Sequence, residues 1–189
     1  MLVVPLGSDP SWNDHIISVA KAEACKLGFL FRTKRFFTPT QLLTLYKAQI
    51  RPCLEYYNNN KHSLNTLDAI QRRAIRLIGD PALTDTLDSL AHRRSASALS
   101  LFYRYYPGYC SDEIKSIIPP KAWFARNSKT QHPYALKLDT NRTNAFANSF
   151  IPMTSRDWNS LPPTVFPTTY NFQSFKTSIP RYLRLLPNL

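Results

Sequence analysis

Residues 26–56 read KLGFLFRTKRFFTPTQLLTLYKAQIRPCLEY. The stretch begins in an apolar, basic helix and passes through an elbow in which cations alternate with aromatic rings. Thr38 and Pro39 predict a helix start, because threonine can cap free amides and proline has no amide to leave unpaired. Apolar residues then recur at helical spacing, and Pro52 predicts a kink or break near residues 49–51. The stretch therefore predicts two helices joined by an elbow.

Further helices are predicted on both sides of this stretch. The first helix is expected to begin near Ser11 or Asn13, either of which can cap it. Its apolar stripe recurs at steps of three and four residues: Ile17, Ala20, Ala24, Leu27 and Phe31. A third helix is predicted over residues 63–78, ended by Gly79. Its expected core positions are Leu67, Ile70, Ala74 and Leu77. Shorter helices are predicted near residues 84–92, 93–106 and 111–118.

The composition changes after residue 113. Residues 1–113 carry 14 Lys and Arg against 10 Asp and Glu, whereas residues 114–189 carry 10 against two, with nine prolines. Proline removes an amide donor and restricts its predecessor, so short elements are expected there, including a turn at residues 158–163. A closing helix over residues 171–186 is expected to be interrupted at Pro180. The predicted fold is mostly α, with a helical domain at residues 11–118 and a proline-rich, irregular basic extension at residues 119–189.

The net charge is +12 and the isoelectric point is about 9.8. Such an excess favours polyanionic partners, nucleic acid ahead of an anionic membrane surface. The N-terminal residues lack the basic leader of a signal peptide, and no apolar run approaches membrane-spanning length. The chain is therefore expected to be intracellular and not bound to membranes, with nucleus and cytoplasm both open.

Metal, cofactor and catalytic sites have little support. Cys25, Cys53 and Cys110 lie far apart and in odd number, so neither zinc ligation nor a disulfide framework is expected. The four histidines form no metal-ligand pair. No two adjacent aspartates could hold magnesium for nucleotidyl transfer, and with four glycines there is no phosphate-binding glycine loop. We expect no catalytic residue, no metal and no cofactor.

Two basic clusters are the candidate nucleic-acid contacts. Arg32, Lys34 and Arg35 lie in the elbow. Arg72, Arg73 and Arg76 follow one another on the third helix, with the first and last one turn apart. Guanidinium and ammonium groups neutralise phosphates, although a solvated helix face is nearly as good an interpretation of the second cluster. The rings between residues 29 and 37 are expected in the core.

Several blocks, in order, resemble the region after the polymerase palm in non-LTR, LINE-type (jockey-like) retrotransposon reverse transcriptases. The blocks are WNDHI at 12–16, FTPTQLLTLYKAQIRP at 37–52, LDAIQRRAIRLIG at 67–79, LSLFYRYY at 99–106 and WNSLP at 158–162. The similarity covers roughly residues 3–184. Between residues 56 and 63 the chain is shorter than family members, which usually carry a tryptophan and glycines there.

The resemblance implies a parent enzyme that is an RNA-directed DNA polymerase. It makes residues 1–10 a remnant of a palm strand and places the catalytic aspartates upstream, so the chain by itself is not expected to be an enzyme. It implies that the thumb-like helices lie along a template–primer duplex of RNA or DNA. A thumb without its palm should also expose an apolar seam on its first two helices, involving some of Ile17, Leu27, Leu42 and Leu45. Two alternatives stay open: a non-catalytic module that binds a protein on this seam, and a non-functional translated retrotransposon fossil.

Overall fold

The structure, a computed structural model, describes residues 12–55, 61–107, 110–122, 132, 134–138, 143–147 and 149–185. These residues are mostly α-helical, with one isolated bridge between Lys121 and Leu136 and no β-strand. Contacts divide the chain into two compact units, residues 1–90 and 91–189. The boundary between the units lies before residue 118, where we expected the helical domain to end, because the helix at residues 90–105 packs with later segments. The proposed palm remnant, residues 1–10, lies outside the described residues.

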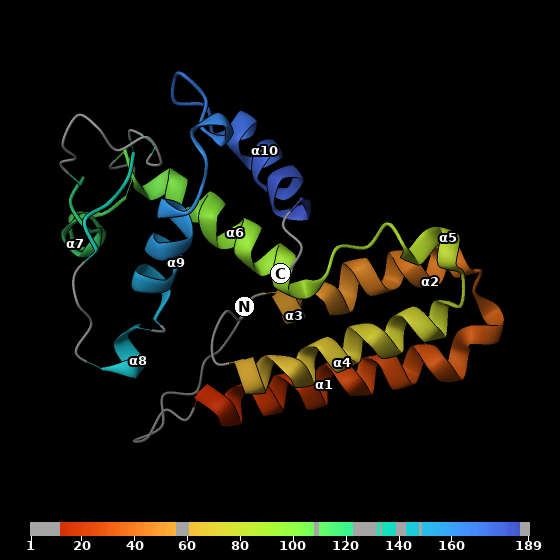
Figure 1. Cartoon of the computed structure of the whole chain (residues 1–189). Helices are drawn as coiled ribbons and strands as arrows, with labels where there is room; N and C mark the ends of the chain where they lie inside the picture. The colour runs from red at the N-terminus through yellow and green to blue at the C-terminus, as the bar shows by residue number, and fades with distance from the viewer. Residues whose placement is uncertain are drawn as a thin grey trace. The chain divides into compact units, whose positions relative to one another are not determined.

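The first unit is built from helices α1 to α5 (Figure 1). They are α1 (Trp12–Thr33), α2 (Pro39–Leu45), α3 (Arg51–Glu55), α4 (Lys61–Ile78) and α5 (Pro81–Thr84). A 3₁₀ turn at Lys34–Phe36 forms the elbow after α1, and a π-helical turn at Tyr46–Ile50 joins α2 to α3. The long helices α1 and α4 pack side by side, and the α2–α3 segment runs alongside them.

Helix α1 buries a face that is rotated from the predicted one. Its buried positions are Ile16, Ala20, Glu23, Leu27 and Leu30, which recur at steps of three and four residues. Ile17 and Phe31, expected in the stripe, are 45% and 70% exposed. Both helical phases are apolar in this sequence, so packing against α4 selects between them.

The start of α2 follows the prediction. Thr38 Oγ1 accepts a hydrogen bond from the Gln41 amide at 3.3 Å, and Gln41 Oε1 accepts one from the Thr38 amide at 2.9 Å. This reciprocal arrangement is a capping box, with Pro39 at the first helical position. The break expected before Pro52 is a π turn, in which the Arg51 amide bonds to the Tyr46 carbonyl. A wider turn accommodates a proline that cannot donate to the helical ladder.

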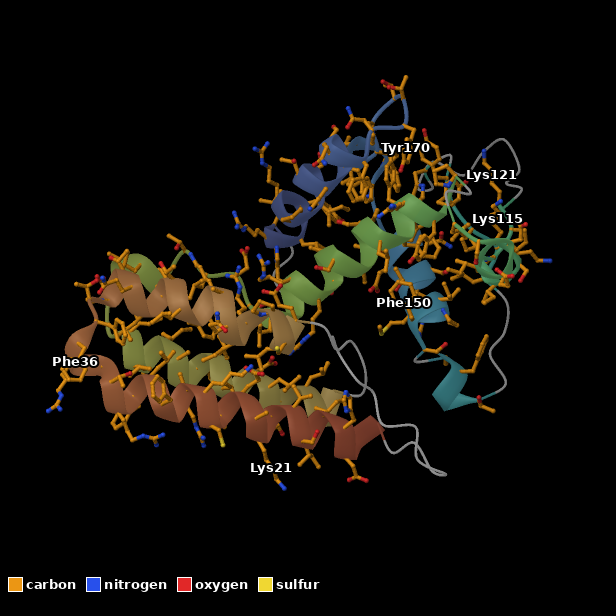
Figure 2. All side chains as sticks on the ribbon, turned by 180° about the vertical axis from the view of Figure 1, so that it is seen from behind. Lys21, Phe36, Lys115, Lys121, Phe150 and Tyr170 are labelled. Carbon is orange, nitrogen blue, oxygen red and sulfur yellow. The ribbon has the colours of Figure 1, made fainter. Side chains whose placement is uncertain are left out.

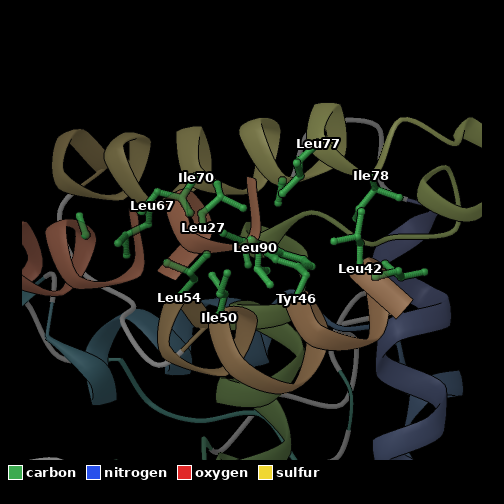
Figure 3. Packing of buried hydrophobic residues seen from close by; sticks show 14 of the residues in the cluster. Leu27, Leu42, Tyr46, Ile50, Leu54, Leu67, Ile70, Leu77, Ile78 and Leu90 are labelled. Carbon is green, nitrogen blue, oxygen red and sulfur yellow. The ribbon is translucent and has the colours of Figure 1, made fainter. Parts of the chain in front are cut away.

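The core of this unit is a layer of aliphatic side chains between α1, α4 and the α2–α3 segment (Figure 3). Ile50, Leu54 and Leu67 are fully buried in it. One polar chain crosses the layer: the Tyr46 hydroxyl donates to Gln71 Oε1 at 3.1 Å, and Gln71 Nε2 donates to the Asp88 carbonyl at 3.1 Å. The four predicted core positions of α4 are all buried, so its predicted phase is confirmed.

Helix α4 ends where the sequence predicts. Gly79 has φ +69°, the left-handed conformation that favours glycine after a helix. The short helix predicted at residues 84–92 is wrong, since Pro81 begins the one-turn helix α5 directly after Asp80. Residues 85–89 are a turn and a short irregular segment before the next helix.

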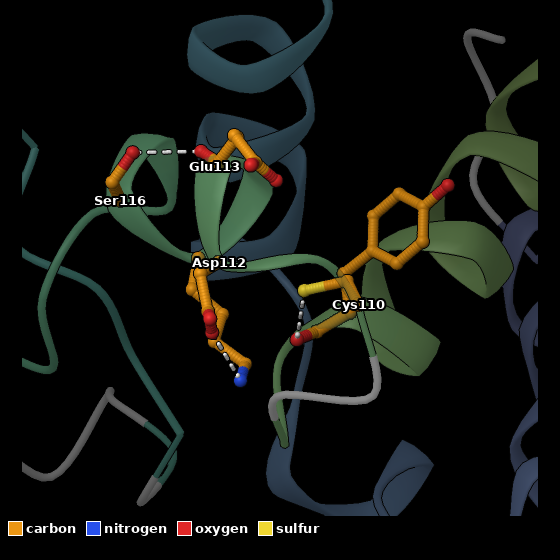
Figure 4. Close-up of polar contacts among 6 residues, drawn as sticks. Cys110, Asp112, Glu113 and Ser116 are labelled. Atoms are coloured by element: carbon orange, nitrogen blue, oxygen red, sulfur yellow. Dashed lines mark hydrogen bonds and ion pairs between the residues drawn. The ribbon is translucent and has the colours of Figure 1, made fainter.

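The second unit contains α6 (Leu90–Tyr105), α7 (Asp112–Ile117), α8 (Asn144–Ala147), α9 (Phe150–Asn159) and α10 (Phe172–Arg184). Local contacts stabilise the short helix α7 and the segment that precedes it (Figure 4). Cys110 Sγ donates to the Tyr105 carbonyl at 3.7 Å, and Lys115 pairs with Asp112 at 2.9 Å. Helix α10 begins at the Asn171 cap and continues through Pro180, where we expected an interruption.

Aromatic rings make the core of the second unit. Trp158 is fully buried, with the centroids of Phe102 and Phe166 at 5.2 Å and 4.9 Å. Tyr103 stacks on Phe175 at 4.0 Å. The predicted turn at residues 158–163 is therefore wrong in its first part, because Trp158 lies in the last turn of α9 and anchors this core.

Candidate nucleic-acid interface

A groove runs along the seam between α1 and α4. Its wider section has a volume of about 370 Å³ and is lined by Ala24, Leu27, Gly28, Phe31 and Lys34 on one side and by Ile70, Arg73, Arg76 and Leu77 on the other. A second section of about 280 Å³ shares Ala24, Ile70 and Arg73 and adds Ile17, Lys21 and Thr66 among its walls. From Ile17 to Phe31 the groove follows α1 for about 20 Å. We call it the basic groove.

Small residues on α1 keep the basic groove open. Ala24 and Gly28 lie one turn apart on the wall. A β-carbon added to Gly28 would meet only the Arg32 Nη1 atom, at 3.8 Å. No neighbouring backbone approaches Gly28 there, so the missing side chain leaves an opening and does not serve a close helix contact.

The charged residues that line the basic groove are all cations. Lys21 and Lys34 come from the α1 side, and Arg73 and Arg76 come from α4. Lys34 Nζ lies 3.8 Å from where a β-carbon on Gly79 would be, beside the C-terminal end of α4, which favours positive charge. Within the described part of the chain, neither Arg73 nor Arg76 pairs with a carboxylate.

The structure brings together three of the six predicted contact residues, namely Lys34, Arg73 and Arg76. Arg32 lies at the groove's edge, above Gly28. The Arg35 guanidinium lies 4.7 Å from the centroid of the Phe36 ring.

Arg72 occupies a different position. It lines a separate hollow with Asp68, Gln71 and Ser89 among its walls. The predicted arginine triplet is thus divided between two hollows. Arg73 and Arg76, three residues apart, share the groove.

The rings of the elbow differ from the prediction. Phe29, Phe31, Phe36 and Phe37 are 58%, 70%, 68% and 36% exposed, whereas we expected them in the core. Phe29 and Phe31 flank the buried face of α1. Phe36 and Phe37 lie beyond the end of the helix, where no partner helix covers them, and Phe36 projects from the elbow (Figure 2).

Sequence reasoning missed two groove residues, Lys21 and Phe31. Phe31 was assigned to the core stripe, and Lys21 was left off the stripe without a role. A usable signal was present, since residues 21, 24, 28 and 31 share one helical face on which two small residues separate a cation from a ring.

Of the four residues proposed for the exposed apolar seam, the structure exposes some and buries others. Ile17 is exposed and Leu45 is half-buried, but Leu27 and Leu42 are buried. The exposed apolar side chains Ile17 and Phe31 line the groove between α1 and α4.

Elsewhere, polar groups are held by local structure. Glu23, buried in α1, binds the Lys26 ammonium at 2.7 Å. Burial raises the pKa of the Cys53 thiol, and the neighbouring Glu23 carboxylate raises it further, so that thiol is a poor nucleophile at neutral pH. In the described residues no cluster of His, Cys, Asp or Glu could hold a metal ion. Among those residues, no helix is both long and apolar enough to cross a bilayer.

No protein-family model matches the sequence, and neither a curated protein nor a solved structure shows significant similarity to it.

Proposed function

We propose that the chain is the thumb-like and C-terminal part of a LINE-type reverse transcriptase, without its palm. In this proposal it binds nucleic acid through phosphates with little sequence preference and does not polymerise by itself. The observation that supports binding best is the basic groove, in which four cations line an open channel and no acid lies among them. The family assignment is supported by the ordered sequence blocks alone.

The charge arrangement favours a phosphate backbone over an isolated anion. The groove's cations are spread along the channel, with Lys21 and Lys34 13 residues apart on the α1 side. A backbone that follows the channel would meet several of them in turn. Backbone contacts of this kind position a strand without reading its bases.

Salt-dependent binding tests the proposal. If about four phosphates are neutralised, the logarithm of the affinity should fall against the logarithm of the salt concentration with a slope of roughly −3 to −4. Arg73→Gln with Arg76→Gln should flatten the slope by roughly two units. The measurement is fluorescence anisotropy of a labelled RNA–DNA hybrid at several salt concentrations.

The matched control is Arg72→Gln. It removes one charge from α4, as each groove arginine does when replaced singly, but faces a separate hollow, so it should change the slope less than Arg73→Gln or Arg76→Gln alone. An affinity that is indifferent to salt would rule out phosphate contacts. If only the Arg72 variant had a flatter salt dependence, the phosphate contacts would lie outside the groove.

A second candidate, protein docking, is favoured by the four exposed phenylalanines around the elbow. Exposed apolar patches of this kind often mark partner sites. It predicts that Phe29→Ser and Phe36→Ser abolish partner binding and leave nucleic-acid affinity unchanged.

A further inference from the structure

The basic groove combines two kinds of surface. Its floor is apolar, formed by Leu27, Ile70 and Leu77, and one wall carries the exposed ring of Phe31. Its rim carries the ammonium of Lys34 and the guanidinium groups of Arg73 and Arg76. Phosphate contacts alone would require the rim but neither the ring nor the apolar floor.

A ligand that matches both surfaces has a flat apolar part joined to a phosphate. A nucleotide has this chemistry, because its base can stack on an aromatic ring while its phosphate binds cations. The wider section of about 370 Å³ is in the range of single small-ligand sites. Inside a duplex both faces of each base are covered by neighbours, so a base must lie beyond the paired stack to enter the groove and stack on Phe31.

We propose that the wider section of the basic groove holds an unpaired nucleotide at the end of a nucleic-acid strand. Phe31 stacks on its base, and Lys34, Arg73 and Arg76 bind the adjacent phosphates. This inference rests on the proposed function and adds a preference to it: the chain should bind duplexes with a single-stranded extension more tightly than blunt duplexes.

The choice of a strand over a free nucleotide follows from the groove's length. The channel continues past Arg73 to Lys21 and Thr66, with a second volume of about 280 Å³. A mononucleotide would occupy only the wider section. A strand gains further phosphate contacts along the channel.

The test compares two labelled hairpins of equal phosphate number, each closed by a linker without bases, one blunt and one with a short unpaired extension. The wild-type chain should prefer the extended hairpin by about fivefold or more, the effect of one stacked base. Phe31→Ala should remove the preference and leave the salt slope unchanged, because no charge is lost. Phe36→Ala is the control, since that ring is as exposed but does not line the groove.

A second variant tests the groove by filling it. Gly28→Leu has free space for its β-carbon and replaces a poor helix former with a good one, so α1 should stay folded. It should also abolish the preference for the extension with no change of charge. Circular dichroism confirms the fold of each variant.

The outcomes separate the two proposals. Absence of salt-dependent binding to both hairpins would overturn the proposed function. Salt-dependent binding with no preference for the extension, or a preference that survives both Phe31→Ala and Gly28→Leu, would overturn this inference alone. Full competition by free adenosine monophosphate at micromolar concentration would show a mononucleotide site and contradict a strand.

Discussion

At the scale of single residues, His132 is a buried titratable side chain in the aromatic core of the second unit. It is 1% exposed and stacks on Phe166 at 4.3 Å. Its Nε2 atom lies 2.9 Å from the Trp158 carbonyl, and its Nδ1 atom accepts a hydrogen bond from the Tyr134 amide. These bonds require the neutral ring with its proton on Nε2. Burial lowers the pKa of His132, and the bond to the Trp158 carbonyl offsets this only in part.

We therefore expect acid to destabilise the second unit. The unfolded chain binds a proton at His132 near pH 6.5, whereas the folded chain resists it, so this stability is complete above pH 6.5 and lost as the pH falls through the lower folded pKa. Urea unfolding followed by circular dichroism at pH 7.5, 6.5 and 5.5 should show a falling midpoint. The His132→Gln variant should have a lower urea midpoint at pH 7.5, and that midpoint should fall less between pH 7.5 and 5.5. An equal loss in both proteins would assign the effect to other groups.

The side chain of Asn159 makes two long-range hydrogen bonds that the sequence pattern does not reveal. Its side-chain oxygen accepts from the Leu136 amide at 2.9 Å, and its amide donates to the Leu136 carbonyl at 2.8 Å. It pairs with the chain at residue 136 as a neighbouring strand would. In the sequence, the Trp158–Asn159 pair indicated only a turn, because the partner is 23 residues away.

At the scale of elements, local signals predicted where helices begin and end. The cap at Thr38 and the stop at Gly79 depend only on nearby residues, and both are present. The closing helix was predicted from residue 171, and Asn171 caps it. Which face of α1 is buried was not predictable, since Ile16 and Ile17 are equally apolar and α4 decides between them. The groove depends on that choice, so only its α4 cations and Lys34 were predicted from the sequence.

Helix α9 was missed for a different reason. Pro152 lies in the first turn of α9, where a missing amide costs little. Ser149 precedes the helix as its cap residue. Only short elements and a turn at residues 158–163 were expected in this region, so the proline was not used as a start signal.

Loss of the α2 cap should be measurable. Thr38→Ala removes the acceptor for the Gln41 amide and should lower the free energy of unfolding by about 1 kcal/mol, the usual cost of losing such a cap. Thr38→Ser keeps the hydroxyl and should be close to wild type. Hydrogen exchange at the α2 amides should accelerate in the alanine variant. Unchanged exchange there would mean that packing alone holds the start of α2.

At the scale of the whole molecule, charge and groove are divided between the two units. Residues 1–90 carry 11 Lys and Arg against eight Asp and Glu, and residues 91–189 carry 13 against four. The first unit thus has a net charge of only +3, and the second has +9. The second unit should therefore add long-range attraction to a polyanion, while the groove that makes the proposed phosphate contacts lies in the first.

This division predicts that affinity and discrimination can be changed separately. Lys176→Gln with Arg181→Gln removes two exposed cations from α10, the same charge as Arg73→Gln with Arg76→Gln removes from the groove. The α10 pair should weaken binding to blunt and extended hairpins equally, because Coulomb attraction does not depend on an unpaired base. The groove pair should weaken binding to the extended hairpin more. Anisotropy titrations with both hairpins give, for each variant, the ratio of its affinity for the extended hairpin to its affinity for the blunt hairpin. If the α10 pair changed the preference as much as the groove pair does, recognition would not reside in the first unit, and the unpaired end would have to bind elsewhere.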